Sequence, residues 1–201
     1  RDGDYLRHYY YSATGALLGC KVKTKDKQFW YEGDTDGSFY GQHLFPTTGK
    51  RIVITEGELD AASCFECMPG WPMVSLPSGA ASAKKAIKAN LELLQGYEDI
   101  VLFFDNDEPG RKAAEDCAGV LPPGKVRIAL LDAYKDASEA LQSGDTKAVS
   151  RAIYDAKPYR PDGIIEARSL LELVTTPLPP NDYDYGSDGT DKLLQGTRYG
   201  T

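Results

Sequence analysis

Carboxylate side chains follow two apolar segments of this 201-residue chain and could together bind a cation. Glu-Gly-Glu at 56–58 comes directly after RIVIT, and Asp-Asn-Asp at 105–107 directly after VLFF. A third apolar segment, KVRIALLD, is followed by Lys-Asp at 135–136. Close carboxylates raise one another's pKa unless a divalent cation neutralises them. A small cluster of hard oxygen ligands is typical of Mg²⁺ or Mn²⁺, which also recruit substrate phosphates.

Each of these segments also has a simpler interpretation. An Asp-x-Asp pair after a strand is often a turn or a helix N-cap, and Asp107 could cap a helix that begins at Glu108-Pro109. A single Glu-Gly after a strand is equally ordinary. A shared site is favoured because ligands of an open α/β sheet gather outside the carboxyl ends of its strands.

The surrounding sequence predicts the elements that would position these acids. From residue 51 onward, apolar segments alternate with helical patterns, which indicates an α/β fold with a mostly parallel sheet flanked by helices. Residues 5–45 hold short aromatic and β-branched segments between turn pairs, which predicts a small antiparallel β unit before the sheet. The helical patterns cover 59–68, 81–97, 108–121, 136–144, 146–156 and 166–174.

Composition limits the function classes. The net charge is −7, and residues 51–150 hold 16 acidic against 10 basic residues, so a nucleic-acid site would need a local basic patch. Cys64 and Cys67 have CxxC spacing but no second close pair, so we expect reduced thiols and no zinc. No apolar run reaches the length of a membrane span, and no Gly-rich nucleotide-binding motif is present.

The acid segments resemble the Toprim motif of bacterial-type primases, topoisomerases and some nucleases, in TEGELDA and LFFDNDEPGRKA. VKTKDKQFW, YGQHLF, VSLPSGAASAKK, LPPGKVRIALL, YKDASEAL and RPDGII extend the resemblance to bacteriophage primase–helicases, relatives of the mitochondrial Twinkle helicase. The resemblance implies a small basic β subdomain of the primase (1–50) and a Toprim catalytic domain (51–163). It also implies a helix and flexible linker (164–201) towards a helicase domain absent here.

The resemblance further implies DNA-templated synthesis of short RNA primers from NTPs, dependent on Mg²⁺ or Mn²⁺. A 3′-hydroxyl would attack the α-phosphate of an NTP with pyrophosphate leaving, and divalent ions would stabilise the developing charge. The catalytic and metal-binding acids would be Glu56, Asp105 and Asp107, with Asp60 and Asp136 as further metal acids. Gly57 would let the backbone approach closely.

Four lysines alternate with other residues in CKVKTKDKQFW, so on a strand they would share one face. Lysines of this kind either bind a polyanion or lie on a solvated edge strand, where they prevent pairing with another chain. The resemblance favours contact with the template or the incoming nucleotide, which would position the nucleic acid without reading its sequence. These lysines are Lys21, Lys23, Lys25 and Lys27.

Further residues could contact the nucleotide. Ser78-Gly79 opens a helical segment whose first amides attract phosphate, although an ordinary helix start is as good an account. The other candidates also have simpler interpretations. Lys84 and Lys85 could be solvated lysines, Arg111 a solvated arginine on a helix, and His43 a structural histidine. The nucleotide-binding candidates are Gly57, Ser78, Gly79, Lys84, Lys85, Arg111, Lys135 and His43.

The expected partners are a single-stranded DNA template, NTPs and the RNA primer, together with zinc-binding and helicase domains of a parent chain. A replicative DNA polymerase is a further candidate partner, and no membrane is expected. The expected location is the cytoplasm of an infected bacterial host, or the mitochondrion for a Twinkle-like protein. Two other functions stay open: a Toprim nuclease, which shares the acid cluster, and a non-catalytic DNA-binding module of a replicative helicase.

Overall fold

The predicted mostly parallel sheet is present in a computed structural model that describes residues 5–26, 28–35, 37–160 and 175. Its strand order is β5-β4-β6-β7-β8, in which the first four strands are parallel and the short edge strand β8 is antiparallel. The predicted fold class is therefore confirmed. The strands are β4 (Gly49–Thr55), β5 (Met73–Ser75), β6 (Tyr97–Phe103), β7 (Val126–Ile128) and β8 (Lys157–Pro158).

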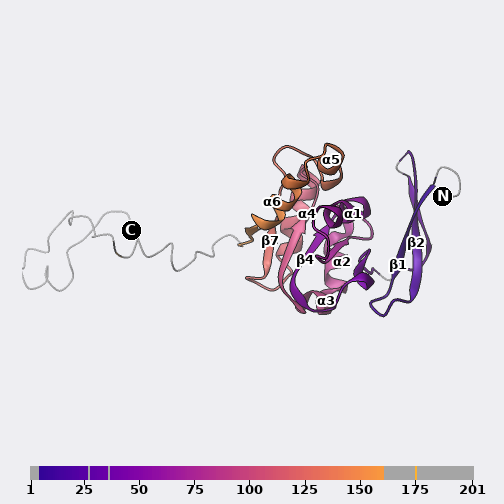
Figure 1. Ribbon diagram of the computed structural model, residues 1–201. Helices are drawn as coiled ribbons and strands as arrows, with labels where there is room; N and C mark the ends of the chain where they lie inside the picture. The colour runs from indigo at the N-terminus through magenta and orange to yellow at the C-terminus, as the bar shows by residue number, and fades with distance from the viewer. Residues whose placement is uncertain (1–4, 27, 36, 161–174, 176–201) are drawn as a thin grey trace, which may run out of the picture. The chain divides into compact units, whose positions relative to one another are not determined.

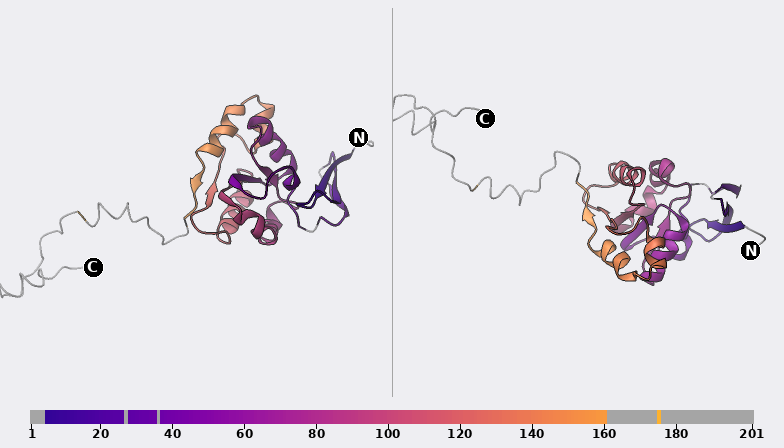
Figure 2. Two further views of the ribbon diagram at one scale, coloured as in Figure 1. Left: turned by 60° about the horizontal axis from the view of Figure 1, so that its bottom comes forward. Right: turned by 90° about the horizontal axis from the view of Figure 1, so that it is seen from above.

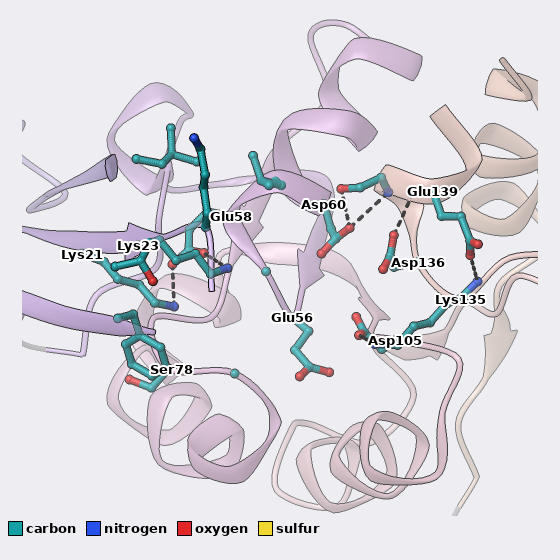
Figure 3. Close-up of a pocket in the computed structure, with 18 of the residues that line it drawn as sticks. Lys21, Lys23, Glu56, Glu58, Asp60, Ser78, Asp105, Lys135, Asp136 and Glu139 are labelled. Carbon is teal, nitrogen blue, oxygen red and sulfur yellow. Dashed lines mark hydrogen bonds and ion pairs between the residues drawn. The ribbon is translucent and has the colours of Figure 1, made fainter. Parts of the chain in front are cut away.

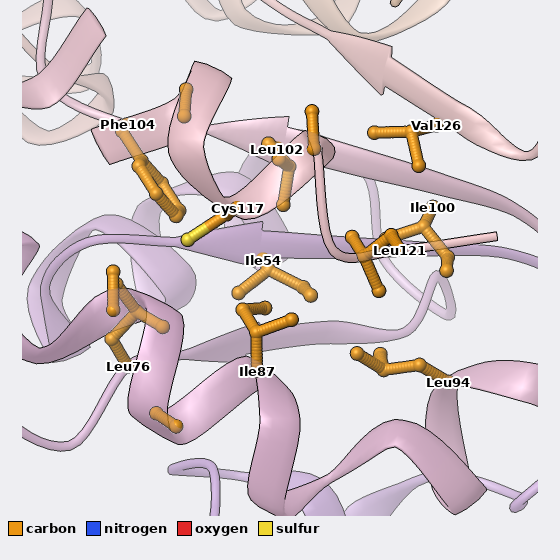
Figure 4. Close-up of a cluster of buried hydrophobic side chains, with 14 of the residues drawn as sticks. Ile54, Leu76, Ile87, Leu94, Ile100, Leu102, Phe104, Cys117, Leu121 and Val126 are labelled. Atoms are coloured by element: carbon orange, nitrogen blue, oxygen red, sulfur yellow. The ribbon is translucent and has the colours of Figure 1, made fainter. Parts of the chain in front are cut away.

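Helices cover both faces of this sheet (Figures 1 and 2). The core on one face includes Ile54 and Leu102 of the sheet, packed under α2, α3 and α4 (Figure 4). The core on the other face includes Val53 and Val101, packed under α1, α5 and α6. The helices are α1 (Glu58–Cys67), α2 (Ala83–Ala89), α3 (Leu91–Gln95), α4 (Glu108–Ala118), α5 (Ala137–Gln142) and α6 (Thr146–Tyr154).

A second, three-stranded antiparallel sheet precedes the parallel one. It consists of β1 (Tyr5–Tyr11), β2 (Leu17–Thr24) and β3 (Phe29–Gly33), in the order β1-β2-β3. The segment 38–45, expected to extend this β unit, instead contains the short 3₁₀ helix η1 (Gln42–Leu44). Tyr40 forms a bridge to Ser75 of β5, so this segment pairs with the parallel sheet.

The helical pattern over 81–97 is divided into two helices at Asn90. The Asn90 side-chain amide donates hydrogen bonds to the carbonyl oxygens of Gly37 (3.0 Å) and Ala86 (2.8 Å). A side chain that binds main-chain oxygens in this way competes with the regular helix. A further 3₁₀ turn, η2 (Ala80–Ser82), precedes α2.

Some sequence predictions lie outside the described residues. These are Lys27, the helix at 166–174 and the linker towards residue 201, with Thr175 alone described there. In the part of the chain that is described, no helix combines the length and the apolar character needed to cross a membrane.

Candidate active site

The acid segments follow three neighbouring strands and meet at the carboxyl edge of the parallel sheet. Glu56 follows β4, Asp105 follows β6, and Lys135 and Asp136 follow β7. They line a cleft of about 970 Å³, in which Lys21 and Lys23 of β2 also lie (Figure 3). The topology thus brings acids that are far apart in sequence to one side of a shared cleft.

Glu56 is a half-buried carboxylate, and only one of its two oxygens accepts a hydrogen bond from the described residues. The main-chain N–H of Ala80 donates to Oε1 at 3.2 Å. Oε2 is buried and has no hydrogen-bond partner among the described residues. Burial, followed by the charges of Asp105 and Asp107, raises the pKa of Glu56. A cation at Oε2 would satisfy this oxygen and offset the repulsion.

Asp107 has one of the two roles that its sequence position left open, the helix cap. Its Oδ1 accepts a hydrogen bond from the Gly110 N–H at 2.9 Å, so it is the N-cap of α4. Its Oδ2 lies 3.6 Å from Lys135 Nζ, which also lies 3.0 Å from Oδ2 of Asp105. The cap therefore uses one oxygen of Asp107 and leaves the other beside Lys135, while Asp107 itself is not among the residues that line the cleft.

Asp136, the N-cap of α5, and Asp60, in the first turn of α1, both line the cleft. Asp136 caps α5 by accepting from the Glu139 N–H at 2.8 Å. Asp60 accepts from the Ser138 N–H at 3.1 Å and from Ser138 Oγ at 2.7 Å. Burial is the main reason why the pKa of Asp60 is raised to about 6. The hydrogen bonds from Ser138 lower this pKa, and the negative charge of Asp136 raises it further.

The donor set fits a hard divalent cation. It consists of carboxylate oxygens, the ligands that Mg²⁺ and Mn²⁺ prefer, and includes the buried, unsatisfied Oε2 of Glu56. As they stand, no three His, Cys, Asp or Glu side chains of the described residues form a ready metal-ligand group. A cation would therefore have to draw Glu56, Asp105 and Asp107 closer together.

Two glycines allow close approach of the backbone at the site. A Cβ at Gly57 would lie 2.7 Å from Oδ2 of Asp60, and a Cβ at Gly110 would lie 2.3 Å from the main-chain oxygen of Asp105. Both distances are far below an ordinary van der Waals contact. Glycine at 110 thus lets α4 pack directly against the backbone that carries Asp105.

We expect Gly110→Ala to destabilise the protein by about 1–3 kcal/mol, because the Asp105 backbone would have to shift. Alanine in a helix interior normally stabilises by about 1 kcal/mol relative to glycine, so the expected sign is opposite to the usual one. Urea unfolding measures the difference. Gly119→Ala is the matched control, since its Cβ would meet nothing closer than 3.7 Å. A Gly110→Ala protein as stable as the wild type would contradict the close contact.

The lysines of β2 lie in different environments. Lys21 and Lys23 share the face of the small sheet that meets α1, as their alternation predicted. Lys21 is only 5% exposed: its Nζ lies 2.8 Å from Oε1 of Glu58 and donates to the Pro77 carbonyl at 2.9 Å. Lys23 is partly exposed, and its Nζ lies 3.8 Å from Oε2 of Glu58. Both, with Lys25, line the cleft.

Sequence reasoning missed Glu58 as a structural centre. Glu58 is 1% exposed and also accepts a hydrogen bond from Tyr10 OH at 2.8 Å. Burial favours the neutral acid, but Lys21 and the Tyr10 hydroxyl hold the pKa of Glu58 below its usual value. Tyr31 contributes a further contact, because its hydroxyl bonds to the Pro77 carbonyl and to Ser78 Oγ. The small sheet and the parallel-sheet region are thus joined by polar contacts, of which those of Tyr10 with Glu58 and of Lys21 with Pro77 are buried.

The candidate nucleotide contacts separate into two groups. Gly57, Ser78, Gly79 and Lys135 line the cleft, whereas Lys84, Lys85, Arg111 and His43 are not among the lining residues. The Arg111 guanidinium donates to the main-chain and side-chain oxygens of Asn106, and His43 packs against Tyr11 with ring centroids 4.2 Å apart.

Comparisons with known proteins agree with this architecture. Residues 53–141 match the Toprim-like family model. Over 198 residues, the chain is 41% identical to the DNA helicase/primase of Enterobacteria phage T3. The match covers 95% of this chain but only 34% of the phage protein, so the chain spans about a third of that relative.

Two solved structures are similar to the chain over most of its length. The primase fragment of the bacteriophage T7 primase-helicase protein superposes with a TM-score of 0.72 at 41% identity, covering 76% of this chain and 64% of that one. A structure of the T7 lagging-strand DNA polymerase interacting with primase domains of two gp4 subunits, an RNA/DNA hybrid and dTTP contains a second match. It has a TM-score of 0.73 and 41% identity, and covers 79% of this chain and 82% of the matched chain.

Proposed function

This chain belongs to the Toprim-containing primase domains of bacteriophage primase–helicases, and we propose that it synthesises short RNA primers from NTPs on a DNA template. The observation that carries the proposal is the convergence of Glu56, Asp105 and Lys135 at one cleft that also contains lysines of β2. Acids suit the binding of a divalent metal, which in turn recruits a triphosphate, and lysines suit the binding of a phosphate backbone.

We propose that Glu56, Asp105 and Asp107 hold Mg²⁺ or Mn²⁺, with Asp60 and Asp136 as outer acids. When bound, the metal supplies charge stabilisation for phosphoryl transfer and lowers the pKa of an attacking hydroxyl. Glu56 is also positioned to accept the proton of the 3′-hydroxyl, because it lines the cleft and its Oε2 has no hydrogen-bond partner among the described residues. Gly57 and Gly79 keep the backbone of the surrounding loops close to the acids.

The basic residues have separate roles in this proposal. Lys23 and Lys25 contact phosphates of the template or of the incoming nucleotide together with Lys27. Lys21 supports the same wall of the cleft through its buried ion pair with Glu58. Ser78, Gly79 and Lys135 contact the NTP from within the cleft, and Lys84, Lys85, Arg111 and His43 form outer contacts that a bound substrate would have to reach.

The larger protein is part of the proposal, because the chain spans about a third of its phage T3 relative. We propose that it works with zinc-binding and helicase domains of a parent chain in the cytoplasm of an infected bacterium. A replicative DNA polymerase is a proposed further partner, by analogy with the T7 structure that contains a polymerase and primase domains.

A primer-synthesis assay tests the proposed function. The chain is incubated with single-stranded DNA, labelled NTPs and Mg²⁺ or Mn²⁺, and is compared with an Asp105→Ala/Asp107→Ala variant. We expect oligoribonucleotides from the wild type and none from the variant. Nicked DNA without RNA product would instead identify a nuclease, and DNA binding without either product would identify a non-catalytic module.

A further inference from the structure

Lys135 brings a positive charge to the point where the acids of the cleft meet. Its Nζ lies 3.0 Å from Oδ2 of Asp105 and 3.6 Å from Oδ2 of Asp107, so one ammonium contacts both aspartates. These two oxygens belong to the residues that the proposed function assigns to the metal. The lysine therefore occupies part of the space that a cation would need.

The backbone of Lys135 is anchored, whereas its side chain is exposed. Its carbonyl accepts a hydrogen bond from the Asn106 N–H at 2.7 Å, and its own N–H donates to Oε2 of Glu139 at 2.6 Å. The side chain is 55% exposed and extends along the edge of the cleft to Asp105 (Figure 3). The ammonium can therefore leave by side-chain rotation while the loop stays in place.

A divalent metal and this ammonium compete for Oδ2 of Asp105. Mg²⁺ binds carboxylate oxygen at about 2.1 Å, so a metal on Oδ2 would lie no more than about 5 Å from the ammonium, whose Nζ is 3.0 Å from the same oxygen. Two cations at that distance repel strongly. The three carboxylates, in contrast, repel one another whenever both cations are absent.

We infer that Lys135 is a resident counter-ion: it pairs with Asp105 and Asp107 in the metal-free protein and is displaced when Mg²⁺ or Mn²⁺ enters. This inference rests on the proposed metal-dependent function. The displaced ammonium stays at the cleft because its backbone is held. An NTP triphosphate then provides a new anionic partner, so metal entry and nucleotide binding are coupled through one side chain.

Mn²⁺ binding without nucleotide, measured by electron paramagnetic resonance, tests the inference. We expect Lys135→Met to bind Mn²⁺ about fivefold more tightly than the wild type, the scale of a partly exposed ion pair. Metal-free Lys135→Met should melt at a lower temperature and gain more on adding Mn²⁺. Lys135→Arg keeps the charge and should resemble the wild type. Lys147→Met is the matched control, since Lys147 is exposed on α6 and does not line the cleft.

The outcomes distinguish the inference from the function on which it rests. Equal or weaker Mn²⁺ binding by Lys135→Met would overturn the counter-ion role, and would leave Lys135 as a nucleotide ligand only. Mn²⁺ binding by none of these proteins would overturn the metal-dependent function and the inference together. The expected gain in affinity, together with a wild type that makes no primers, would support the counter-ion role and contradict the proposed function.

Discussion

Glu56→Gln should lower primer synthesis by about 10²- to 10⁴-fold, the range expected when a group that moves a proton is removed. The substitution keeps the size of the side chain, and the amide oxygen can still accept the hydrogen bond from Ala80. It removes the negative charge from the buried oxygen that has no hydrogen-bond partner in the described residues. Loss of a proton acceptor and loss of a metal ligand both predict this result.

The same substitution should stabilise the metal-free protein at neutral pH. Burial and the neighbouring aspartates raise the pKa of Glu56 above its ordinary value of 4.5, so its ionised form is less favourable in the folded chain than in the unfolded chain. The wild type therefore loses stability as the pH rises from about 4.5 through the raised pKa, and Glu56→Gln lacks this loss. A variant that is more stable and nearly inactive separates a functional charge from a structural one.

Thermal unfolding at pH 4 and pH 7.5, in parallel with the primer assay, checks both parts of this prediction. Glu115→Gln is the matched control, because Glu115 is exposed on α4 and does not line the cleft. Glu115→Gln should keep both activity and stability. A Glu56→Gln protein with wild-type activity would remove Glu56 from the proposed active site.

The positions of the acids could be predicted from the sequence because local patterns determine them. Apolar strands ending at Glu56 and Asp105, with helices between them, imply a parallel sheet with both acids at its carboxyl edge. The α4 cap by Asp107 was equally visible, because Asp-Glu-Pro is typical of a helix start. Neither inference required knowledge of a contact between distant segments.

Long-range contacts account for what the sequence did not show. The alternation of Lys21 and Lys23 placed them on one face of a strand, but nothing local indicated that a buried glutamate lies opposite. In the sequence Glu58 was one of the acids that follow the first apolar segment, and no local pattern distinguished it from Glu56. The pairing of Tyr40 with Ser75 was hidden for the same reason, because bridge partners 35 positions apart leave no periodic pattern.

Glu58→Ala should destabilise the protein by about 3–5 kcal/mol, the usual cost of leaving a buried ion without its partner. Lys21 would stay buried without the Glu58 carboxylate that balances its charge, and the Tyr10 hydroxyl would lose its hydrogen-bond acceptor. Urea unfolding measures the loss. Glu32→Ala, which removes the exposed partner of Arg7 in the same sheet, is the control and should have a much smaller effect.

Combining Glu58→Leu with Lys21→Met should recover most of the lost stability, because well-packed apolar side chains can replace a buried ion pair. Glu58→Leu alone fills the same space but leaves Lys21 unpaired, so a stability gain from adding Lys21→Met separates an uncompensated charge from a simple loss of packing. Equal losses from Glu58→Ala and from the double variant would contradict the ion-pair account.

Because Glu58 holds the small sheet against α1, Glu58→Ala should also weaken template binding, and the double variant should restore part of it. The buried pair then keeps the wall that carries Lys23 next to the acids of the cleft.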